Sequence, residues 1–257
     1  MNINVRPKKF LGQHFLRDKN IARKIVNSLT GFGNYNRVLE VGPGTGVLTQ
    51  FLLEDKKFDW TGVELDRDSI AFLNEEYPEV AHNLLEADFL KIDLEGVAEG
   101  SQMAVIGNFP YNISSQILFK VLDNSLLVPE LVGMFQKEVA MRIAAPPGNK
   151  TYGILSVLTQ AHYNVELLFS VDENVFDPPP KVKSAVIRMQ RKDEPLPCSS
   201  KKLARVVKTA FNQRRKTLRN SLKSLNVDWD DLPAHFQGER PEQLSLQDFF
   251  LLTNSFE

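Results

Sequence analysis

The chain has 257 residues, a formal net charge of −1 and a single cysteine, Cys198. This length suits one large domain with a small appendage, or two modest domains. One cysteine excludes an internal disulfide and a cysteine-rich zinc cluster, and we expect no metal. No apolar run approaches the roughly 20 residues that span a bilayer, and the first residues lack the apolar core of a signal peptide. We therefore expect a cytoplasmic protein that makes no contact with a membrane.

Basic residues gather in two blocks, although the whole chain is nearly neutral. Residues 1–24 hold seven lysines and arginines against one acid, and residues 201–223 hold nine with no acid. Such blocks indicate local contact with a polyanion. The competing interpretation is that they form the solvated faces of helices.

Short apolar runs alternate with helical patterns over most of the chain. A first helix is expected at about 19–29, where apolar residues recur at helical spacing. Strands are expected at 37–41, 59–65, 103–107, 131–135, 162–169 and 184–189. Helices are expected between them at 47–53, 68–76 and 114–122. This alternation predicts an α/β fold with a parallel sheet, and the last two strands predict an antiparallel hairpin at its edge.

The end of the chain follows a different pattern. Residues 191–197 are polar and contain two prolines, which is typical of a linker. Beyond them the spacing is helical only, and Ser245 resembles the start signal of a last helix through Leu252. We therefore divide the chain into a domain at 1–190 with a basic N-terminal arm, a linker at 191–197 and a small helical domain at 198–257.

A glycine-rich segment, Glu40-Val-Gly-Pro-Gly-Thr-Gly46, follows the first strand of the α/β region. Glycines let the backbone turn sharply and approach a ligand closely, although dinucleotide enzymes have such a turn too. The G-P-G-T-G spacing differs from G-x-G-x-x-G, and Glu40 precedes the loop. A carboxylate favours the cationic amino and sulfonium groups of S-adenosylmethionine, not a pyrophosphate. We therefore expect S-adenosylmethionine beside Glu40, Gly42 and Gly44.

Two further acids follow the next strands. Glu64 ends the second strand, where an acid can accept both hydroxyls of a ribose. Asp88 stands at the next transition from strand to loop, where it can accept from the adenine amine, with Leu65 and Phe89 on the two faces of the ring. Each acid alone could be a helix cap or a surface charge. Their shared position at carboxyl ends of strands favours a ligand site, because ligands of open α/β sheets bind there.

Five segments resemble one known family. Asn108-Phe-Pro-Tyr111 matches the N-x-P-Y of methyltransferases that act on planar amines. The other four segments match G-Q-N-F-L, Q-K-E-V-x-x-R, F-x-P-x-P-K-V-x-S-x-V and F-x-Q-R-R-K-T-L-R-N, at 9–16, 136–142, 176–186 and 211–220. Together they resemble the small-subunit ribosomal RNA adenosine dimethyltransferases, from about residue 7 to residue 252.

The resemblance implies a fold, an activity and a partner. The fold is a Rossmann-like class I methyltransferase domain with a small helical domain behind it. The activity is transfer of methyl groups from S-adenosylmethionine to N6 of two adjacent adenosines in a hairpin loop near the 3′ end of 16S rRNA. The partner is that RNA within the immature small ribosomal subunit, and the expected working form is a monomer.

The matched loop also implies roles for its residues. An adenine amine is a poor nucleophile because its lone pair is delocalised into the ring. The Asn108 side-chain carbonyl and the Phe109 backbone carbonyl would accept its hydrogens and draw the nitrogen toward a tetrahedral shape. Pro110 lacks an N–H and has a fixed φ, so it would hold the Phe109 carbonyl in place. Tyr111 would stack on one face of the base and Phe176 would cover the other.

The N-terminal signature implies cofactor contacts from Gln13, His14 and Leu16. The family most often has asparagine where this chain has His14, and leucine where it has Phe109. Phe109 should be tolerated, because that position contributes its backbone carbonyl. A histidine still offers a hydrogen-bonding nitrogen, and its titration adds a source of pH dependence.

The basic segments supply the expected RNA contacts, although some of these side chains could instead pair with acids inside the fold. The candidates are Arg214, Arg215, Lys216 and Arg219, then Lys8, Lys9 and Lys181. Three alternative functions remain: a related 23S rRNA adenine N6-methyltransferase, a non-catalytic ribosome-assembly checkpoint factor and a nicotinamide-dependent dehydrogenase. The loop spacing and N-x-P-Y argue against the dehydrogenase.

Overall fold

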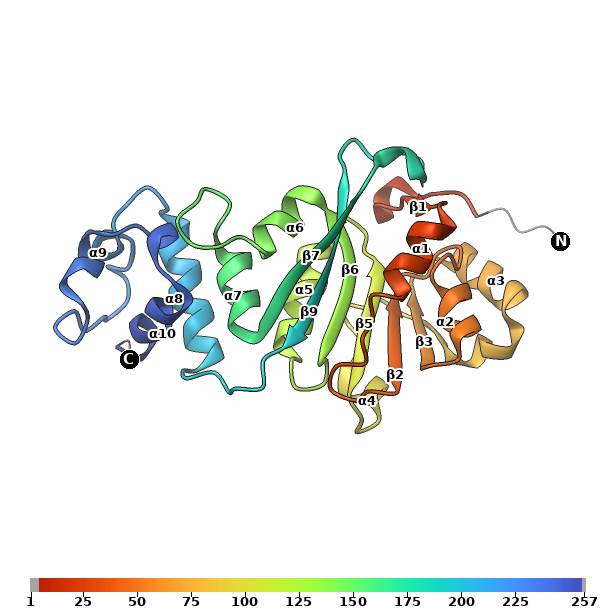
Figure 1. The fold of residues 1–257 in the computed structure, drawn as a ribbon, viewed down its shortest axis with the longest axis horizontal. Helices are drawn as coiled ribbons and strands as arrows, with labels where there is room; N and C mark the ends of the chain where they lie inside the picture. Colours follow the sequence, from red (N-terminus) through yellow and green to blue (C-terminus); the bar gives the residue numbers. More distant parts are fainter. Residues whose placement is uncertain (1–4, 256–257) are drawn as a thin grey trace. The chain divides into compact units, whose positions relative to one another are not determined.

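A computed structural model describes residues 5–255. Its main sheet has seven strands in the order β4-β3-β2-β5-β6-β9-β7, and Figure 1 shows this order from β3 to β7. The strands from β4 to β6 are parallel, and β9 runs antiparallel to β6. The bounds are β2 (Arg37–Val41), β3 (Asp59–Glu64), β4 (Leu84–Glu86), β5 (Met103–Asn108), β6 (Glu130–Gln136), β7 (Tyr163–Val171) and β9 (Ser184–Arg191). The predicted α/β fold is thus confirmed.

Ten α-helices and a two-stranded sheet complete the described chain. The small sheet pairs β1 (Phe15–Leu16) with β8 (Phe176–Asp177) antiparallel. The helices are α1 (Lys19–Val26), α2 (Thr49–Asp55), α3 (Arg67–Glu76), α4 (Leu94–Ala98), α5 (Ser114–Asp123), α6 (Lys137–Ile143), α7 (Ile154–His162), α8 (Ser200–Asn212), α9 (Leu218–Ser221) and α10 (Leu246–Asn254). None of the helices in residues 5–255 is both long enough and apolar enough to span a bilayer.

The six predicted strands and the helices around them appear within a few residues of their expected bounds. The sequence analysis missed β4, which has only three residues, and the helices α4, α6 and α7. The spacing of Leu218, Leu222 and Leu225 in the sequence fits one helix, whereas α9 ends at Ser221 and Leu225 closes a turn onto Leu222. Leu222 and Leu225 are nevertheless buried, because a turn can bury the same side chains as a helix.

Contacts divide the described chain into two units. One holds the residues through Ala140 together with Glu166–Arg191, and the other holds Met141–Val165 and the residues from Lys192 onward. The segment around α7 was assigned to the first domain on sequence, but α7 packs on α8 and α10 in the second unit. Tyr152 contributes to that unit, with its ring at 6.2 Å from that of Phe211.

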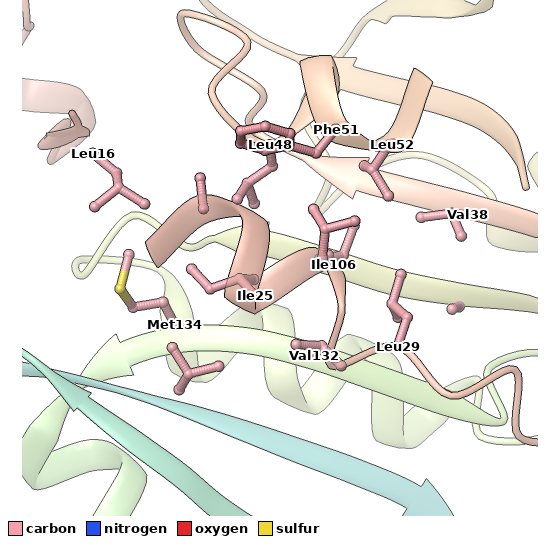
Figure 2. Packing of buried hydrophobic residues seen from close by; sticks show 14 of the residues in the cluster. Leu16, Ile25, Leu29, Val38, Leu48, Phe51, Leu52, Ile106, Val132 and Met134 are labelled. Carbon is pink, nitrogen blue, oxygen red and sulfur yellow. The ribbon is translucent and has the colours of Figure 1, made fainter. Parts of the chain in front are cut away.

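The core of the first unit lies between the sheet and its covering helices. Figure 2 shows Ile25 of α1 between Phe51 of α2 on one side and Met134 of β6 on the other. Ile25 and Met134 are fully buried, and Phe51 is nearly so. Asp18 begins α1 by accepting the N–H groups of Asn20 and Ile21, which would otherwise lack partners in the first turn. Hydrophobic burial here fixes the strand ends that carry the polar residues described below.

A buried carboxylate ties the opposite end of β6 to the segment before β2. Glu130 is fully buried, and its oxygens accept from the Thr30 backbone and hydroxyl, the Gly31 N–H and the Tyr35 hydroxyl. Burial, followed by this contact with Glu130, raises the pKa of the Tyr35 hydroxyl. The cluster satisfies its polar groups internally, which indicates a structural role.

We predict that Glu130→Ala lowers the free energy of unfolding by at least about 2–3 kcal/mol, because it leaves several buried donors without a partner. Tyr35→Phe, which removes one donor only, should cost less. Urea unfolding at neutral pH measures both. Equal stability of Glu130→Ala and the wild type would contradict the assigned role.

Candidate active site

A pocket lies at the carboxyl ends of β2, β3 and β5, where the order of the strands along the chain reverses between β2 and β5. Ligands of open α/β sheets bind at such a switch point. The pocket holds about 760 Å³ of space between its lining atoms, part of it open to solvent. Its lining includes Gln13, His14, Gly42, Gly44, Glu64, Leu65, Asp88, Phe89, Asn108, Phe109, Pro110 and Tyr111.

The glycine loop forms one wall of this pocket. Gly42 and Gly44 have φ values of 69° and 59°, in the left-handed region that side chains disfavour. A Cβ on Gly44 would lie 2.9 Å from the ring of Phe15, whereas a Cβ on Gly42 would meet no protein atom within 4 Å. The backbone at Gly42 is therefore open to a ligand.

Glu64 connects that loop to the turn after β3. One of its oxygens accepts the Gly44 N–H at 2.9 Å, and the other accepts the N–H groups of Leu65 and Asp66 at 2.8 and 2.9 Å. Burial raises the pKa of Glu64, and these three bonds counteract that rise by favouring the ionised form. The side chain thus shapes the loop. The oxygen that accepts the Gly44 N–H keeps one lone pair for a ligand hydroxyl, whereas two N–H groups occupy the lone pairs of the other oxygen.

Glu40 does not line the main pocket. It faces a small adjoining cavity with Gly42, Gly44 and Asn108. One of its oxygens accepts from the Thr49 hydroxyl and the Trp60 indole N–H, both at 2.8 Å. Burial raises the pKa of Glu40 to about 7, against the effect of those two bonds. The structure therefore places Glu40 behind the glycine loop.

Leu65, Asp88 and Phe89 lie on the pocket as predicted. Leu65 is 52% exposed and Phe89 is buried. An oxygen of Asp88 accepts the Leu90 N–H at 3.0 Å, which fixes the carboxylate at the start of its loop. Leu65 and Phe89 offer apolar surface and Asp88 offers an acceptor, a combination that suits a flat heterocycle with an amine.

The N-terminal arm closes another side of the pocket. Gln13 donates to Asp66 at 3.0 Å and accepts the Lys8 backbone N–H at 2.8 Å. His14 bonds the Pro178 carbonyl through Nδ1 at 2.7 Å; a carbonyl only accepts, so Nδ1 carries the proton. Gln13 and His14 line the pocket, whereas Leu16 is buried in the core and reaches only the adjoining cavity.

Asn108, at the end of β5, has a fixed orientation. Its side-chain nitrogen donates to the His14 backbone carbonyl at 2.9 Å. Since that carbonyl can only accept, the NH₂ group must face it, and the amide oxygen points to the other side. Asn108 lines the pocket, so an acceptor is held at its wall.

Phe109 is anchored by a slot between two strands. Its ring is 1% exposed and packs edge-on against Phe135 at 5.1 Å. Gly107 and Gly133 stand opposite each other on β5 and β6, and a Cβ on either would come within 2.7 or 2.2 Å of the ring. The missing side chains make room for phenylalanine, which explains how this chain accommodates the larger residue.

Two contacts fix the side chain of Tyr111. Its hydroxyl forms a hydrogen bond with the Ser184 hydroxyl, and its ring stacks on His14 with centroids 5.4 Å apart at 28°. Burial raises the pKa of the Tyr111 hydroxyl. Phe176 is not brought to the pocket: it pairs with Leu16 across the small sheet, is 2% exposed and packs in the core. In this structure Phe176 therefore lies too deep to cover a base.

The predicted RNA contacts of the first unit differ in their surroundings. Lys8 forms ion pairs with Asp66 and with Asp68, which raise its pKa, so its charge is matched within the fold. Lys9 and Lys181 are exposed at the surface. The alternative of an internal ion pair thus applies to Lys8.

The predicted RNA contacts of the second unit also differ in their surroundings. Arg214 is half-buried, donates to the Asn149 carbonyl at 3.2 Å and lies 3.8 Å from a Glu242 carboxylate oxygen. Arg219 is exposed and donates to Gln237 at 2.8 Å. Arg215 and Lys216 are exposed. Arg214 therefore already makes contacts within the fold, whereas Arg215 and Lys216 face solvent.

This arrangement fits S-adenosylmethionine. The site offers carboxylates at Glu64 and Asp88, apolar side chains at Leu65 and Phe89, and bare backbone at Gly42. These match the ribose and the adenine of the cofactor, and its amino-acid part, which must come close to the backbone of the loop. Within residues 5–255, no group of three or more histidine, cysteine, aspartate or glutamate side chains is placed to hold a metal ion.

Solved structures define the class. The chain superimposes on a dimethyladenosine transferase from Plasmodium falciparum with a TM-score of 0.77 and 24% identity, covering 95% of this chain and 99% of that one. It superimposes on the 23S rRNA methyltransferase ErmE with a TM-score of 0.71 and 24% identity, covering 94% and 98%. The fold is that of the class I S-adenosylmethionine-dependent methyltransferases.

Sequence relatives narrow the class to a family. A family model described as ribosomal RNA adenine dimethylase matches residues 4–240. Relatives named ribosomal RNA small subunit methyltransferase A are 55% identical over 251 residues in Cytophaga hutchinsonii (97% of both chains) and 57% identical over 251 residues in Parabacteroides distasonis (97% of this chain, 93% of the relative). The chain belongs to the ribosomal RNA adenine dimethylase family.

Three residues that position the site were not predicted from the sequence. Asp66 holds Gln13 and Lys8, Ser184 holds Tyr111, and Gly133 admits the ring of Phe109. Asp66 is the cap of α3, and this common role gave no reason to single it out. A glycine inside a strand was a usable signal for Gly133, because it often marks a close approach of another group.

We predict that Gly133→Ala lowers stability by about 1–3 kcal/mol and reduces kcat for methyl transfer, because the new methyl group pushes the Phe109 ring and its backbone out of place. Adding Phe109→Leu should restore part of both losses, since leucine is shorter. Urea unfolding and turnover of the single and double variants measure this. A double variant no better than Gly133→Ala would contradict the slot.

We also predict a pH-dependent stability difference between the wild type and Glu40→Gln, whose amide oxygen can keep both accepted bonds. The carboxyl ionises near 4.5 in the unfolded chain and near 7 in the folded one. Below pH 4.5 both states carry the proton and the proteins should differ little. As pH rises from 4.5 to 7, the unfolded chain loses this proton and the folded chain keeps it, so the wild type should lose about 3 kcal/mol relative to the variant, and the difference should level off above pH 7. A constant difference from pH 4.5 to 8 would contradict this.

Proposed function

We propose that the protein transfers methyl groups from S-adenosylmethionine to N6 of two adjacent adenosines in a hairpin loop near the 3′ end of 16S rRNA, giving N6,N6-dimethyladenosine. The observation that carries the proposal is the fixed acceptor at Asn108, whose NH₂ group is taken by the His14 carbonyl. The names of the 55–57% identical relatives support the small-subunit target.

Binding of the cofactor would use both walls of the pocket. Glu64 would accept a ribose hydroxyl through the oxygen that keeps a free lone pair, and Asp88 would accept the adenine amine between Leu65 and Phe89. Gly42, Gly44, Gln13 and His14 would surround the remaining chain, with Glu40 as a second layer behind the loop. When bound, S-adenosylmethionine supplies an electrophilic methyl group.

The residues of the loop would activate the target amine by position. The Asn108 side-chain oxygen and the Phe109 carbonyl accept the two N6 hydrogens, so the nitrogen lone pair is freed from the ring and aligned with the methyl group. Pro110 and the slotted Phe109 ring keep the second carbonyl in place. Glu64 is already bonded by three N–H groups, so we assign no carboxylate base and the product nitrogen loses its proton to water.

The target adenosine would leave its stack and lie against Tyr111. The hydrogen bond to Ser184 fixes the plane of that ring, and His14 already occupies one face of it. An adenine would therefore use the other face or replace His14. Base-aromatic stacking contributes roughly 1–3 kcal/mol per base.

The proposed partner is the 16S rRNA of the immature small subunit, in the cytoplasm, and the proposed working form is a monomer. Lys9 and Lys181 near the pocket, and Arg215 and Lys216 in the proposed C-terminal RNA-binding domain (198–257), face solvent and would meet phosphates. The chain shares the fold of the 23S rRNA methyltransferase ErmE at 24% identity. Methylation of 23S rRNA therefore stays the alternative function.

Small subunits from cells that lack the modification test the proposal. After incubation with the protein and S-adenosylmethionine, mass spectrometry of the digested rRNA should show N6,N6-dimethyladenosine at two adjacent positions near the 3′ end of 16S rRNA. Asn108→Ala should lower kcat by about 10²–10³-fold while still binding subunits, because it removes one acceptor. Methylation of 23S rRNA instead would overturn the target, and full activity of Asn108→Ala would overturn the mechanism.

A further inference from the structure

One aromatic side chain beside the pocket-lining arm stands largely in solvent. Of the phenylalanines in residues 5–255, Phe10 alone is exposed, at 78%. Exposure of a large aromatic ring to water is unfavourable, and a ring that a protein holds in solvent commonly serves a binding surface. Phe10 has no role in the proposed handling of the cofactor or of the target base.

The segment that carries Phe10 is held in a defined turn. The N–H groups of Leu11 and Gly12 bond the carbonyls of Lys8 and Lys9, and Gly12 takes a φ of 67°. Lys8 is fixed by its ion pairs with Asp66 and Asp68. The ring is therefore presented from a closed turn anchored to α3, so little conformational entropy is lost when it binds a flat partner.

This turn lies at the edge of the pocket. Leu11 and Gly12, the two residues after Phe10, both line it. A Cβ on Gly12 would come within 2.5 Å of the Asn112 side-chain oxygen, so the turn rests directly on the residue after Tyr111. A nucleotide next to the one in the pocket would meet this part of the surface.

The charges around Phe10 suit a nucleic acid strand. Lys9 is exposed beside it in the chain. Lys181 is exposed three residues after Pro178, whose carbonyl bonds the His14 ring of the arm. An aromatic ring with flanking cations is the usual surface for unpaired nucleotides: bases stack on the ring and phosphates meet the cations.

We infer that Phe10 is a stacking site for an unpaired base adjacent to the target adenosine, with Lys9 on its phosphate. The inference rests on the proposed function, because the proposed target lies in a hairpin loop whose neighbouring nucleotides are unpaired. Stacking tolerates any base, so Phe10 contributes affinity and places the strand, while Tyr111 and Asn108 select and activate the target.

The test compares steady-state methylation of unmodified small subunits by the wild type, Phe10→Ala, Phe10→Leu, Phe10→Tyr and a matched control, Leu126→Ala. Leu126 is 80% exposed but precedes β6, at the end of the sheet away from the pocket. Phe10→Ala should raise KM for subunits about tenfold and change kcat much less. Phe10→Tyr should restore the wild-type KM, Phe10→Leu should not, and Leu126→Ala should match the wild type. The Kd for S-adenosylmethionine, measured by calorimetry, should be the same in every variant.

Each other outcome is decisive. An unchanged KM in Phe10→Ala, with an active wild type, overturns the stacking site and leaves the proposed function intact. Full recovery by Phe10→Leu overturns it too, since an apolar contact with a ribosomal protein would then suffice. A wild type that methylates neither subunits nor their RNA overturns the proposed function, and the stacking site with it.

Discussion

The buried carboxylate of Glu64 determines the form of the pocket. Its oxygens take N–H groups from the loop after β2 and from the turn after β3, and so hold these two segments together beyond the ends of the paired strands. Taking a carboxylate out of water is costly, and only several donors at good distances offset that cost. The geometry is therefore strict on this side of the pocket, and the cofactor meets a surface formed before it arrives.

The opposite side depends on the N-terminal arm, a segment far from the loops in sequence. The His14 carbonyl orients Asn108, its ring lies on Tyr111, and its Nδ1 reaches the loop after β8. One residue thus joins the arm to the loop after β5 and to the loop after β8. The family position usually holds asparagine, whereas the contact to Asn108 comes from the backbone, so a change of side chain leaves it in place.

The sequence was sufficient for six of the seven strands of the main sheet, because apolar periodicity and glycine punctuation are local properties. It also located Glu64 and Asp88, since polar residues at carboxyl ends of parallel strands meet at one edge, while Gly42 came from the glycine-rich segment and Asn108 from the family resemblance. It could not give the depth of Phe176 or the turning of Glu40 toward Trp60, because these depend on packing between distant segments. The slot at Gly133 required the register of β5 against β6.

The two sides of the pocket are held by different kinds of force. The glycine loop is attached through hydrogen bonds to Glu64, which is 6% exposed, whereas Lys8 attaches the arm through one ion pair with the buried Asp66 and one with the exposed Asp68. Dissolved salt screens charges that water can reach and acts little on buried bonds. Ionic strength therefore weakens the contact between Lys8 and Asp68 on one side of the pocket and acts little on the bonds of Glu64 on the other.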